Sequence, residues 1–403
     1  MPDVTRTIQE LAAQAEPYVI GQRRRFHRHP EPSWHEVWTT EAICGELDAM
    51  GVPWERPTPT GCVATLRGTA PDAYDASGRA RRRLLLRADI DALPIEERTG
   101  APFASECPDV MHACGHDCHI AMMLGTLQVL RQLAGELHGE VRVVFQPAEE
   151  VAGGSALMIE RGVLDGVDGV YGAHIWSEID AGLVSLEAGP RMANVDWFRI
   201  DVTGEGCHGA MPDRGCDAVV AAAAIVVELQ TIVSRELSPL EPAVVTVGKL
   251  HGGAARNIIA GSASLTGTVR TFGEATHERM PGLVARVARH TAAAHGATAE
   301  LTEYLVGNRA VINDPASSAR ARAAAERVLG PDAVGTYAGT MSGEDFSSYL
   351  ERVPGVFVLL GTRNPACDAT WPQHSPCYTV DESVLVRGVM LAAQYACDYL
   401  AEP

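Results

Sequence analysis

The sequence contains almost no lysine and few aromatic residues. Lys249 is the only lysine among 403 residues, and it lies in an alternating, strand-like segment. Enzymes that form a Schiff base, including those that use pyridoxal phosphate, would depend on this single poorly placed residue. The sequence therefore argues against that class of enzyme.

Long apolar runs are also absent. No uninterrupted apolar stretch is long enough to span a bilayer, and residues 1–16 are polar and helix-like, unlike a signal peptide. These features predict a cytoplasmic protein. The ten cysteines follow no repeating spacing, so we expect reduced thiols, any of which can serve as a metal ligand.

Positive charge is scarce relative to negative charge. The chain has 33 Lys and Arg residues against 51 Asp and Glu residues, which gives a formal net charge of -18. Nucleic acids and anionic membranes would meet a repelling field rather than a basic surface. The composition therefore predicts neither a nucleic-acid nor a membrane partner.

The first half of the chain alternates helical segments with short apolar strands. This pattern is typical of a mostly parallel sheet covered by helices on both faces. It predicts an α/β catalytic domain formed by residues 1–188 and 309–403. The expected strands are 84–90, 141–146, 170–173 and 356–361.

Between residues 189 and 308 the pattern changes to β-α-β-β-α-β. This is the order of a ferredoxin-like α+β unit, so we expect an inserted second domain over 189–308. The expected strands are 197–203, 244–250, 263–271 and 298–306, and the expected helices are 217–235 and 278–295.

Metal-competent side chains follow the expected catalytic-domain strands. Because ligands bind at the carboxyl ends of strands in open α/β sheets, we expect these side chains to converge. A further segment, 111–119, opens an expected helix over 120–133 and adds more donors. The candidates are Asp89, Asp91, Glu149, Glu150, His174 and His374, together with His112, Cys114, His116, Asp117 and His119.

Imidazole, thiolate and carboxylate groups together suit zinc, manganese, cobalt or nickel, and the mixture does not choose among them. Their number exceeds one tetrahedral site, and the thiolate of Cys114 can bridge two ions. Glu149 and Glu150 are adjacent, and neighbouring side chains in extended backbone point apart. One can therefore bind metal while the other acts as a general base.

Several of these residues also have a simpler structural interpretation. Asp89 can be a strand-end cap or a turn former. His27 and His29 are expected to be polar residues at a helix end before Pro30. The residues left undecided are His112, His119, Cys118 and Cys207.

Eight motifs, in order along nearly the whole chain, resemble those of the aminoacylase, hippurate hydrolase and auxin-amino-acid-conjugate hydrolase group of dinuclear metallopeptidases. A single short motif would be weak, but eight in order are specific. They are FHRHPE at 26–31, RADIDALP at 87–94, MHACGHD at 111–117, FQPAEE at 145–150, HGAMP at 208–212, GTVR at 267–270, SGEDF at 342–346 and HSP at 374–376.

The resemblance implies two divalent metal ions and a set of residue roles. Glu149 matches the general base, which takes a proton from activated water and passes it to the leaving amine. Asp91 matches a residue that supports the metal site from behind the ligands. The implied metal ligands are Cys114, His116, Glu150, His174 and His374, with Cys114 shared between the ions.

The resemblance further implies that the inserted domain is a lid and dimerisation domain, which predicts a homodimer. His208 is expected to stabilise the developing oxyanion, in the active site of the other subunit. Asn257 and Arg270 are expected to hold the substrate's carbonyl and carboxylate. Cys207 and Ala260 stand where the family often has Gly and Pro, and both changes bear on substrate fit.

The implied function is hydrolysis of small-molecule N-acyl or N-aroyl L-amino acids to a carboxylic acid and a free amino acid. A dipeptidase and an N-acetyl-diaminopimelate deacetylase are alternatives within the same class. A metal-binding scaffold on this fold is a non-enzymatic alternative, although a scaffold has no need of a base beside the metals. A thiol hydrolase using Cys114 or Cys118 is a third class.

Overall fold

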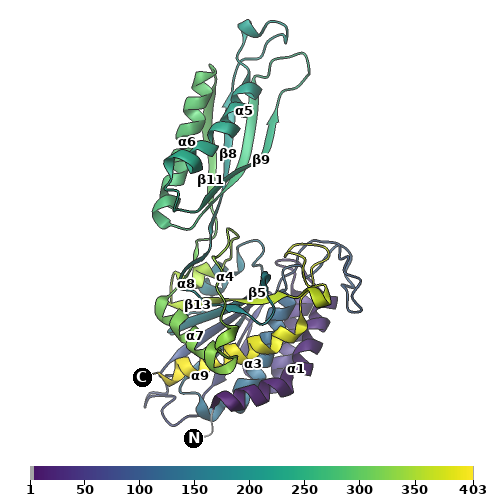
Figure 1. Cartoon of the computed structure of the whole chain (residues 1–403), viewed down its shortest axis with the longest axis vertical. Helices are drawn as coiled ribbons and strands as arrows, with labels where there is room; N and C mark the ends of the chain where they lie inside the picture. The colour runs from purple at the N-terminus through teal and green to yellow at the C-terminus, as the bar shows by residue number, and fades with distance from the viewer. Residues whose placement is uncertain (1–3, 403) are drawn as a thin grey trace. The chain divides into compact units, whose positions relative to one another are not determined.

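The computed structural model describes residues 4–402, which form two compact units. The first unit is discontinuous in sequence, because the second is inserted into it (Figure 1). The first unit contains Met1–Gly189, Ile312–Ala338 and Asp345–Pro403, and the second contains Pro190–Val311 and Gly339–Glu344.

A seven-stranded sheet, in the order β1-β2-β4-β3-β5-β13-β6, forms the centre of the first unit. The four central strands run parallel, and the outer strands pair antiparallel at both edges. A separate two-stranded sheet pairs β7 (Gly189–Met192) with β12 (Val311–Asn313). The strands of the large sheet are β1 (Trp54–Glu55), β2 (Cys62–Arg67), β3 (Arg83–Asp89), β4 (Glu140–Gln146), β5 (Gly169–Asp180), β6 (Val184–Ser185) and β13 (Gly355–Arg363).

Helices cover both faces of this sheet, which confirms the predicted α/β class. Figure 1 shows α1, α3, α7 and α9 on one face and α4 and α8 on the other. This cover explains why β3 and β4 are buried almost throughout rather than on one face only. The helices are α1 (Val4–Arg28), α2 (Val37–Met50), α3 (His116–Gln132), α4 (Gly154–Glu160), α7 (Pro315–Val328), α8 (Ser347–Leu350) and α9 (Leu385–Ala401).

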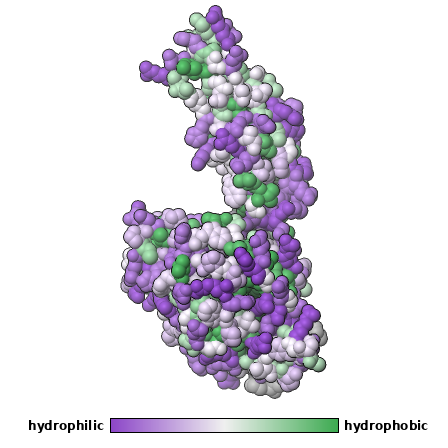
Figure 2. Space-filling model, turned by 180° about the vertical axis from the view of Figure 1, so that it is seen from behind, coloured by the Kyte–Doolittle hydropathy of each residue, from purple (hydrophilic) through white to green (hydrophobic). Residues whose placement is uncertain are grey.

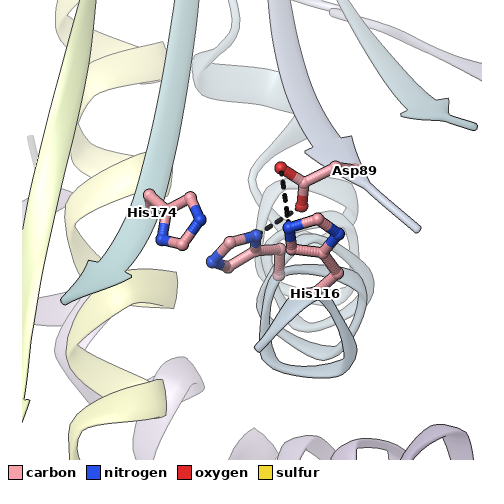
Figure 3. Close-up of side chains that lie close together, drawn as sticks. Asp89, His116 and His174 are labelled. Carbon is pink, nitrogen blue, oxygen red and sulfur yellow. Dashed lines mark hydrogen bonds and ion pairs between the residues drawn. The ribbon is translucent and has the colours of Figure 1, made fainter. Parts of the chain in front are cut away.

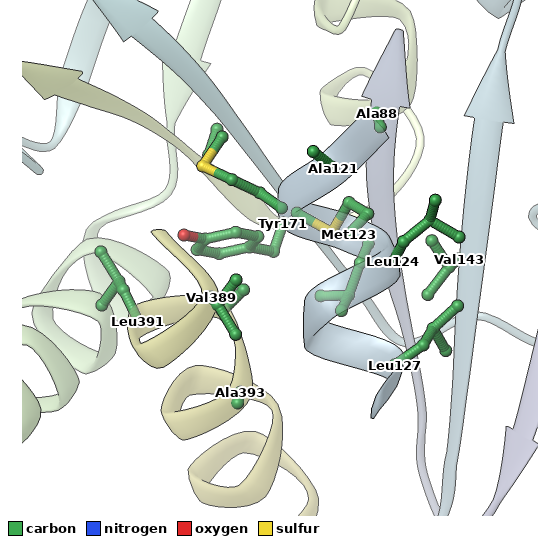
Figure 4. Close-up of a cluster of buried hydrophobic side chains, with 14 of the residues drawn as sticks. Ala88, Ala121, Met123, Leu124, Leu127, Val143, Tyr171, Val389, Leu391 and Ala393 are labelled. Atoms are coloured by element: carbon green, nitrogen blue, oxygen red, sulfur yellow. The ribbon is translucent and has the colours of Figure 1, made fainter. Parts of the chain in front are cut away.

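The main hydrophobic core lies between the sheet and the helices α3 and α9. Figure 4 shows Leu124 and Leu127 of α3 beside Val143 of β4, with Tyr171 of β5 and Val389 of α9 in the same cluster. All five side chains are fully buried. This core fixes α3, and therefore the side chains of its first turn, against the sheet.

The second unit has the predicted ferredoxin-like arrangement. Its four strands form an antiparallel sheet in the order β11-β8-β10-β9, with two helices between them in the chain. The elements are β8 (Asn194–Thr203), α5 (Ala218–Glu228), β9 (Ala243–Gly252), β10 (Ser262–Thr271), α6 (Glu274–Ala294) and β11 (Thr298–Val306).

One predicted helix of the second unit, 217–235, is wrong in its length. The α-helix ends at Glu228, and a π-helical turn follows over Ile232–Glu236. The Thr231 hydroxyl donates to the Glu228 carbonyl at 2.6 Å, and the Ser234 hydroxyl donates to the Gln230 carbonyl at 3.0 Å. Such side-chain bonds compete with the regular helical ladder.

The surface is largely hydrophilic, as the charged composition predicts. Figure 2 shows hydrophilic side chains over most of the face it presents. Within residues 4–402, no helix combines the length and hydropathy needed to span a bilayer.

Helices α1 and α9 both pack closely against α3 at Gly125. A Cβ atom there would lie 2.6 Å from Cγ2 of Val19 and 2.9 Å from Cγ2 of Val389. We predict that Gly125→Ala lowers the free energy of unfolding by roughly 1–2 kcal/mol, because overpacking outweighs the gain in helix propensity. Gly21→Ala, in α1 with no atom within 4 Å of the new Cβ, should instead raise it by up to about 1 kcal/mol. Chemical denaturation of both variants measures the difference, and equal effects would contradict this packing.

Candidate metal centre

The carboxyl ends of the central strands bring the predicted donors together. Asp89 is the last residue of β3, and Glu149 and Glu150 lie three and four residues beyond the end of β4. Figure 3 shows Asp89, His116 and His174 facing one another from β3, α3 and β5. The predicted strand 170–173 was too short, because β5 continues past His174 to Asp180.

Helix α3 begins at His116 rather than at the predicted residue 120. Gly115, immediately before it, has φ 89°, and a Cβ there would lie 2.2 Å from Cδ1 of Ile175. Only glycine fits this left-handed and crowded position. The turn places Cys114 and His116 on either side of Gly115 and aims both at the strand ends.

Three of the predicted ligands form one compact donor set. One ligand atom from each of Cys114, His116 and Glu150 lies within 4.8 Å of the others. The remaining two predicted ligands adjoin this set: His174 Nε2 lies 3.5 Å from Cys114 Sγ, and His374 Nε2 lies 3.5 Å from Glu150 Oε2. The five side chains are therefore contiguous in the first unit.

The donor set fits a divalent cation. His116 Nε2 and Glu150 Oε1 are buried and make no hydrogen bond among the described residues, so a metal ion would not have to displace a hydrogen-bond partner from either atom. Although burial disfavours a charged imidazole, the carboxylates of Asp89, Asp91 and Glu150 raise the pKa of His116 to about 10. These buried carboxylates create a demand for positive charge, and a metal ion held by N, S and O donors would meet it.

Asp91 lies behind two of the predicted ligands. Its Oδ1 is 3.3 Å from His116 Nδ1, and its Oδ2 accepts a hydrogen bond from the Glu150 backbone N–H at 3.0 Å. Ser33 Oγ donates to the same Oδ2 at 2.7 Å. A carboxylate in this position orients the imidazole so that its other nitrogen faces the donor set.

Glu149 and Glu150 point to different neighbours, but not for the predicted reason. They lie in a turn rather than in extended backbone, where Ala152 N–H donates to the Glu149 carbonyl at 2.7 Å. The Glu150 carboxylate faces Cys114 and His116, whereas Glu149 Oε1 is 3.4 Å from the backbone nitrogen of Asp345. The turn thus separates the two carboxylates.

A buried ionic network supports the turn that carries Glu149. Arg87 Nη2 donates to Asp345 Oδ1 at 2.8 Å, and the Gln146 amide donates to both Asp345 oxygens at 3.0 Å. The Ser155 N–H donates to Asp345 Oδ2 at 3.0 Å. Each of these contacts holds Asp345 in place, and the backbone N–H of Asp345 faces Glu149.

The three residues predicted to bind substrate or oxyanion all lie in the second unit. His208 and Asn257 lie on neighbouring segments, since Gly209 N–H donates to the Asn257 carbonyl at 2.8 Å. His208 is exposed, and its Nδ1 accepts a hydrogen bond from Ala210 N–H at 3.1 Å, which leaves Nε2 as the donor. Arg270 lies on β10 and is half-buried.

A family model for Peptidase family M20/M25/M40 matches residues 85–398. The chain belongs to this family. It is 40% identical over 378 residues to the N-acetyl-L-cysteine deacetylase of Bacillus subtilis (strain 168), covering 92% of this chain and 86% of that one. It is 34% identical over 389 residues to the IAA-amino acid hydrolase ILR1-like 4 of Arabidopsis thaliana, covering 96% and 86%.

A solved structure gives the same assignment. The Bacillus subtilis YxeP protein, described as a dinuclear metal binding peptidase from the M20 family, superposes with a TM-score of 0.84 at 35% sequence identity. The match covers 96% of this chain and 99% of that one. The resemblance drawn from the sequence motifs is thereby confirmed, and the M20 chain is a metal-dependent amidohydrolase.

Two residues that the sequence left open, Asp89 and His119, belong to the centre of this M20 site. Together with His116 and His174 they form a second, fully buried donor group. Both nitrogens of His119 are already engaged, however: Ile175 N–H donates to Nε2 at 3.0 Å, and Nδ1 donates to Asp89 Oδ1 at 2.5 Å. His119 therefore lacks a free lone pair for a metal.

His119 and the predicted ligand His174 instead bond to the backbone of the same residue, Ile175. The Ile175 carbonyl accepts a hydrogen bond from His174 Nδ1 at 2.6 Å, which leaves Nε2 facing Cys114. The spacing of His119 three residues after His116 on one helix could have indicated its place in the site.

His27 lies in the last turn of α1, as expected, but it is buried and paired with a carboxylate. His27 is 1% exposed, and its Nδ1 lies 2.7 Å from Asp117 Oδ2. Asp117 also pairs with Arg23, at 2.9 Å from its Nε. These buried charges anchor the first turn of α3 to α1. The FHRHPE motif therefore does not supply a donor itself but helps to hold the helix turn that carries His116. His29, by contrast, is partly exposed, with 40% of its side chain accessible to solvent.

The donor set yields a prediction about metal content. Glu150→Gln removes one negative oxygen from the set and should weaken binding of Mn²⁺ or Zn²⁺ by roughly tenfold or more. His29→Asn changes a partly exposed histidine outside the set; it is the matched control and should bind metal as the wild type does. Elemental analysis after dialysis against limiting metal compares the three proteins. Equal metal content in all three would contradict the assignment of Glu150.

Proposed function

We propose that this M20 enzyme hydrolyses the amide bond of N-acyl or N-aroyl L-amino acids, using two divalent cations and Glu149 as the general base. One observation carries the proposal: the carboxylate of Glu149 lies close enough to Cys114 to add to the effect of burial in raising the pKa of its thiol, yet it is not part of the Cys114, His116 and Glu150 group. A base next to metal donors is what hydrolysis needs and what simple metal storage does not.

The residues that would hold the cations are Cys114, His116, Glu150, His174 and His374. Divalent ions in this position supply Lewis acidity, which activates water and polarises a carbonyl group. Asp91 and His119 keep the ligating imidazoles of His116 and His174 oriented through the contacts described above.

Glu149 would accept a proton from the attacking water at its carboxylate and return it to the leaving nitrogen. It is 9% exposed, so bulk water competes little for this transfer. The Asp345 N–H donates to one carboxylate oxygen of Glu149 at 3.4 Å, which would help to keep the base in one orientation. Such fixed positioning lowers the entropic cost of the reaction.

Arg270 is our candidate for the carboxylate of the amino-acid half. Burial lowers its pKa, because desolvation disfavours the charged guanidinium. The nearby carboxylate of Asp196 is already bonded to His277 Nε2, at 3.0 Å, and to the hydroxyl of Tyr304, at 2.8 Å. A substrate carboxylate would therefore be a favourable partner for Arg270.

The second unit is proposed to act as a lid and dimerisation domain in a homodimer. His208 would stabilise the oxyanion in the active site of the other subunit, and Asn257 would hold the substrate carbonyl. The exposure of His208 and the free Nε2 described above support this role. Cys207 and Ala260 flank the same segments and would influence which substrates fit.

The chemistry of Cys114 and Cys118 speaks against a thiol hydrolase. Burial, with nearby Glu150 for Cys114 and Asp117 for Cys118, raises the pKa of both thiols well above the ordinary value. In the absence of a bound cation neither would be a thiolate nucleophile near neutral pH.

A panel of substrates tests the proposal. The metal-loaded protein should release free amino acid from N-acetyl, N-benzoyl and indole-acyl L-amino acids, as measured by an amine assay. Glu149→Gln should retain its metal but lose turnover by roughly 10²- to 10⁴-fold, because the proton acceptor is gone. Activity in that variant near the wild-type level would refute the base assignment.

The same panel separates the alternatives. Turnover confined to dipeptides would indicate a dipeptidase, and turnover confined to N-acetyl-diaminopimelate would indicate that deacetylase. A chelator should abolish activity, and added Mn²⁺, Zn²⁺ or Co²⁺ should restore it. Activity that survives chelation but is lost on thiol alkylation would overturn the metal mechanism.

A further inference from the structure

Trp34 is an exposed tryptophan in a backbone conformation that tryptophan rarely adopts. Its φ is 68°, and 44% of the residue remains accessible to solvent. A bulky residue in the left-handed region costs free energy, and such outliers gather at ligand-binding and catalytic positions. A tryptophan needed only for packing would be expected inside the protein.

The residues on either side tie Trp34 to the loop that carries the base. Glu36 is fully buried, and its Oε1 accepts hydrogen bonds from the Trp34 N–H at 3.0 Å and from the Ala148 N–H at 2.8 Å. Ala148 immediately precedes Glu149. On the other side, Ser33 donates to Asp91, the carboxylate behind His116. One buried carboxylate therefore fixes Trp34 and the base loop to each other.

The indole itself lies against the same loop. A Cβ atom on Gly153 would lie 2.7 Å from Cζ2 of Trp34, so only glycine lets the ring approach this closely. Ala148 and Ala152 also have positive φ, at 53° and 56°, so the loop is strained where it meets the ring. Val151, in the same turn two residues before Gly153, is 55% exposed. Trp34 and Val151 thus present apolar surface within a few residues of Glu149 and Glu150.

We infer that Trp34 is a specificity-determining residue, whose indole forms a wall for the acyl group of the substrate and favours aromatic acyl groups. This inference rests on the proposed function. The carbonyl to be attacked must lie beside Glu149, so the acyl substituent, one bond away, is within reach of a ring fixed to the Glu149 loop. The amino-acid half has a separate proposed partner in Arg270, which leaves the acyl half for this surface.

An aromatic ring that stacks on an indole gains favourable interaction energy beyond that of the apolar area it buries, whereas a methyl group does not. We therefore expect Trp34→Ala to lower kcat/KM for N-benzoyl and indole-acyl amino acids about tenfold more than for the N-acetyl derivative. The loss should appear mainly in KM, because a wall contacts the acyl group before and during the reaction alike. Trp34→Phe keeps a ring and should restore most of the aromatic preference.

Trp54→Ala is the matched control, since it removes an indole from the edge strand β1, where Trp54 Nε1 donates to Asp48 Oδ1 at 2.8 Å. It should change all substrates by the same factor. If Trp34→Ala lowered kcat/KM equally for acetyl and aromatic substrates, at unchanged metal content, the inference would be overturned. Trp34 would then only stabilise the loop. A wild-type protein inactive on every N-acyl amino acid would instead overturn the proposed function itself.

Discussion

The burial of several carboxylates around one histidine is the constraint on which the site depends. Asp89, Asp91 and Glu150 all face His116, and the first two are almost completely buried. Buried like charges repel one another and lose hydration, so such a cluster is unfavourable unless a positive charge joins it. Arg87 neutralises Asp89 from one side. On the side that carries Cys114 and Glu150, the charge partners among the described residues are the imidazoles of His116 and His374 rather than an arginine, and a cation would supply a permanent positive charge.

The sheet determines where this constraint arises. Parallel strands β4, β3 and β5 end at one edge, so residues separated by up to 85 positions, such as Asp89 and His174, meet there. Helix α3 begins at the same edge because Gly115 allows a sharp left-handed turn. The elements behind the site hold these side chains in fixed directions: α1 through Asp117, the Asp345 network through Glu149, and the buried Glu36 through Ala148.

Much of this architecture could be predicted from the sequence, because it follows from local patterns. Runs such as Leu84–Leu86 and Val141–Val144 indicate buried parallel strands, and polar residues directly after them indicate ligands at the strand ends. The β-α-β-β-α-β order of the second unit is likewise visible as alternating periodicities. The motifs then supplied the family, and with it the expected ligands and base.

The remaining details depend on contacts between distant residues. Nothing in the local sequence shows that both nitrogens of His119 are occupied by Asp89 and Ile175, or that His27 is buried against Asp117. The separation of Glu149 from Glu150 was expected from strand geometry, yet it arises from a turn after Ala148. The position of Trp34 on Gly153 is a long-range contact of the same kind.

We propose that these buried donors hold two cations beside the carboxylate of Glu149. Anomalous diffraction from crystals of the Mn²⁺-loaded protein, recorded at the manganese edge, tests it most directly. We expect two peaks per chain, both next to Cys114. The other ligands should be His116, Glu150, His174 and His374, with Glu149 adjacent. Peaks elsewhere, a single peak, or Glu149 and Glu150 with exchanged positions would contradict it.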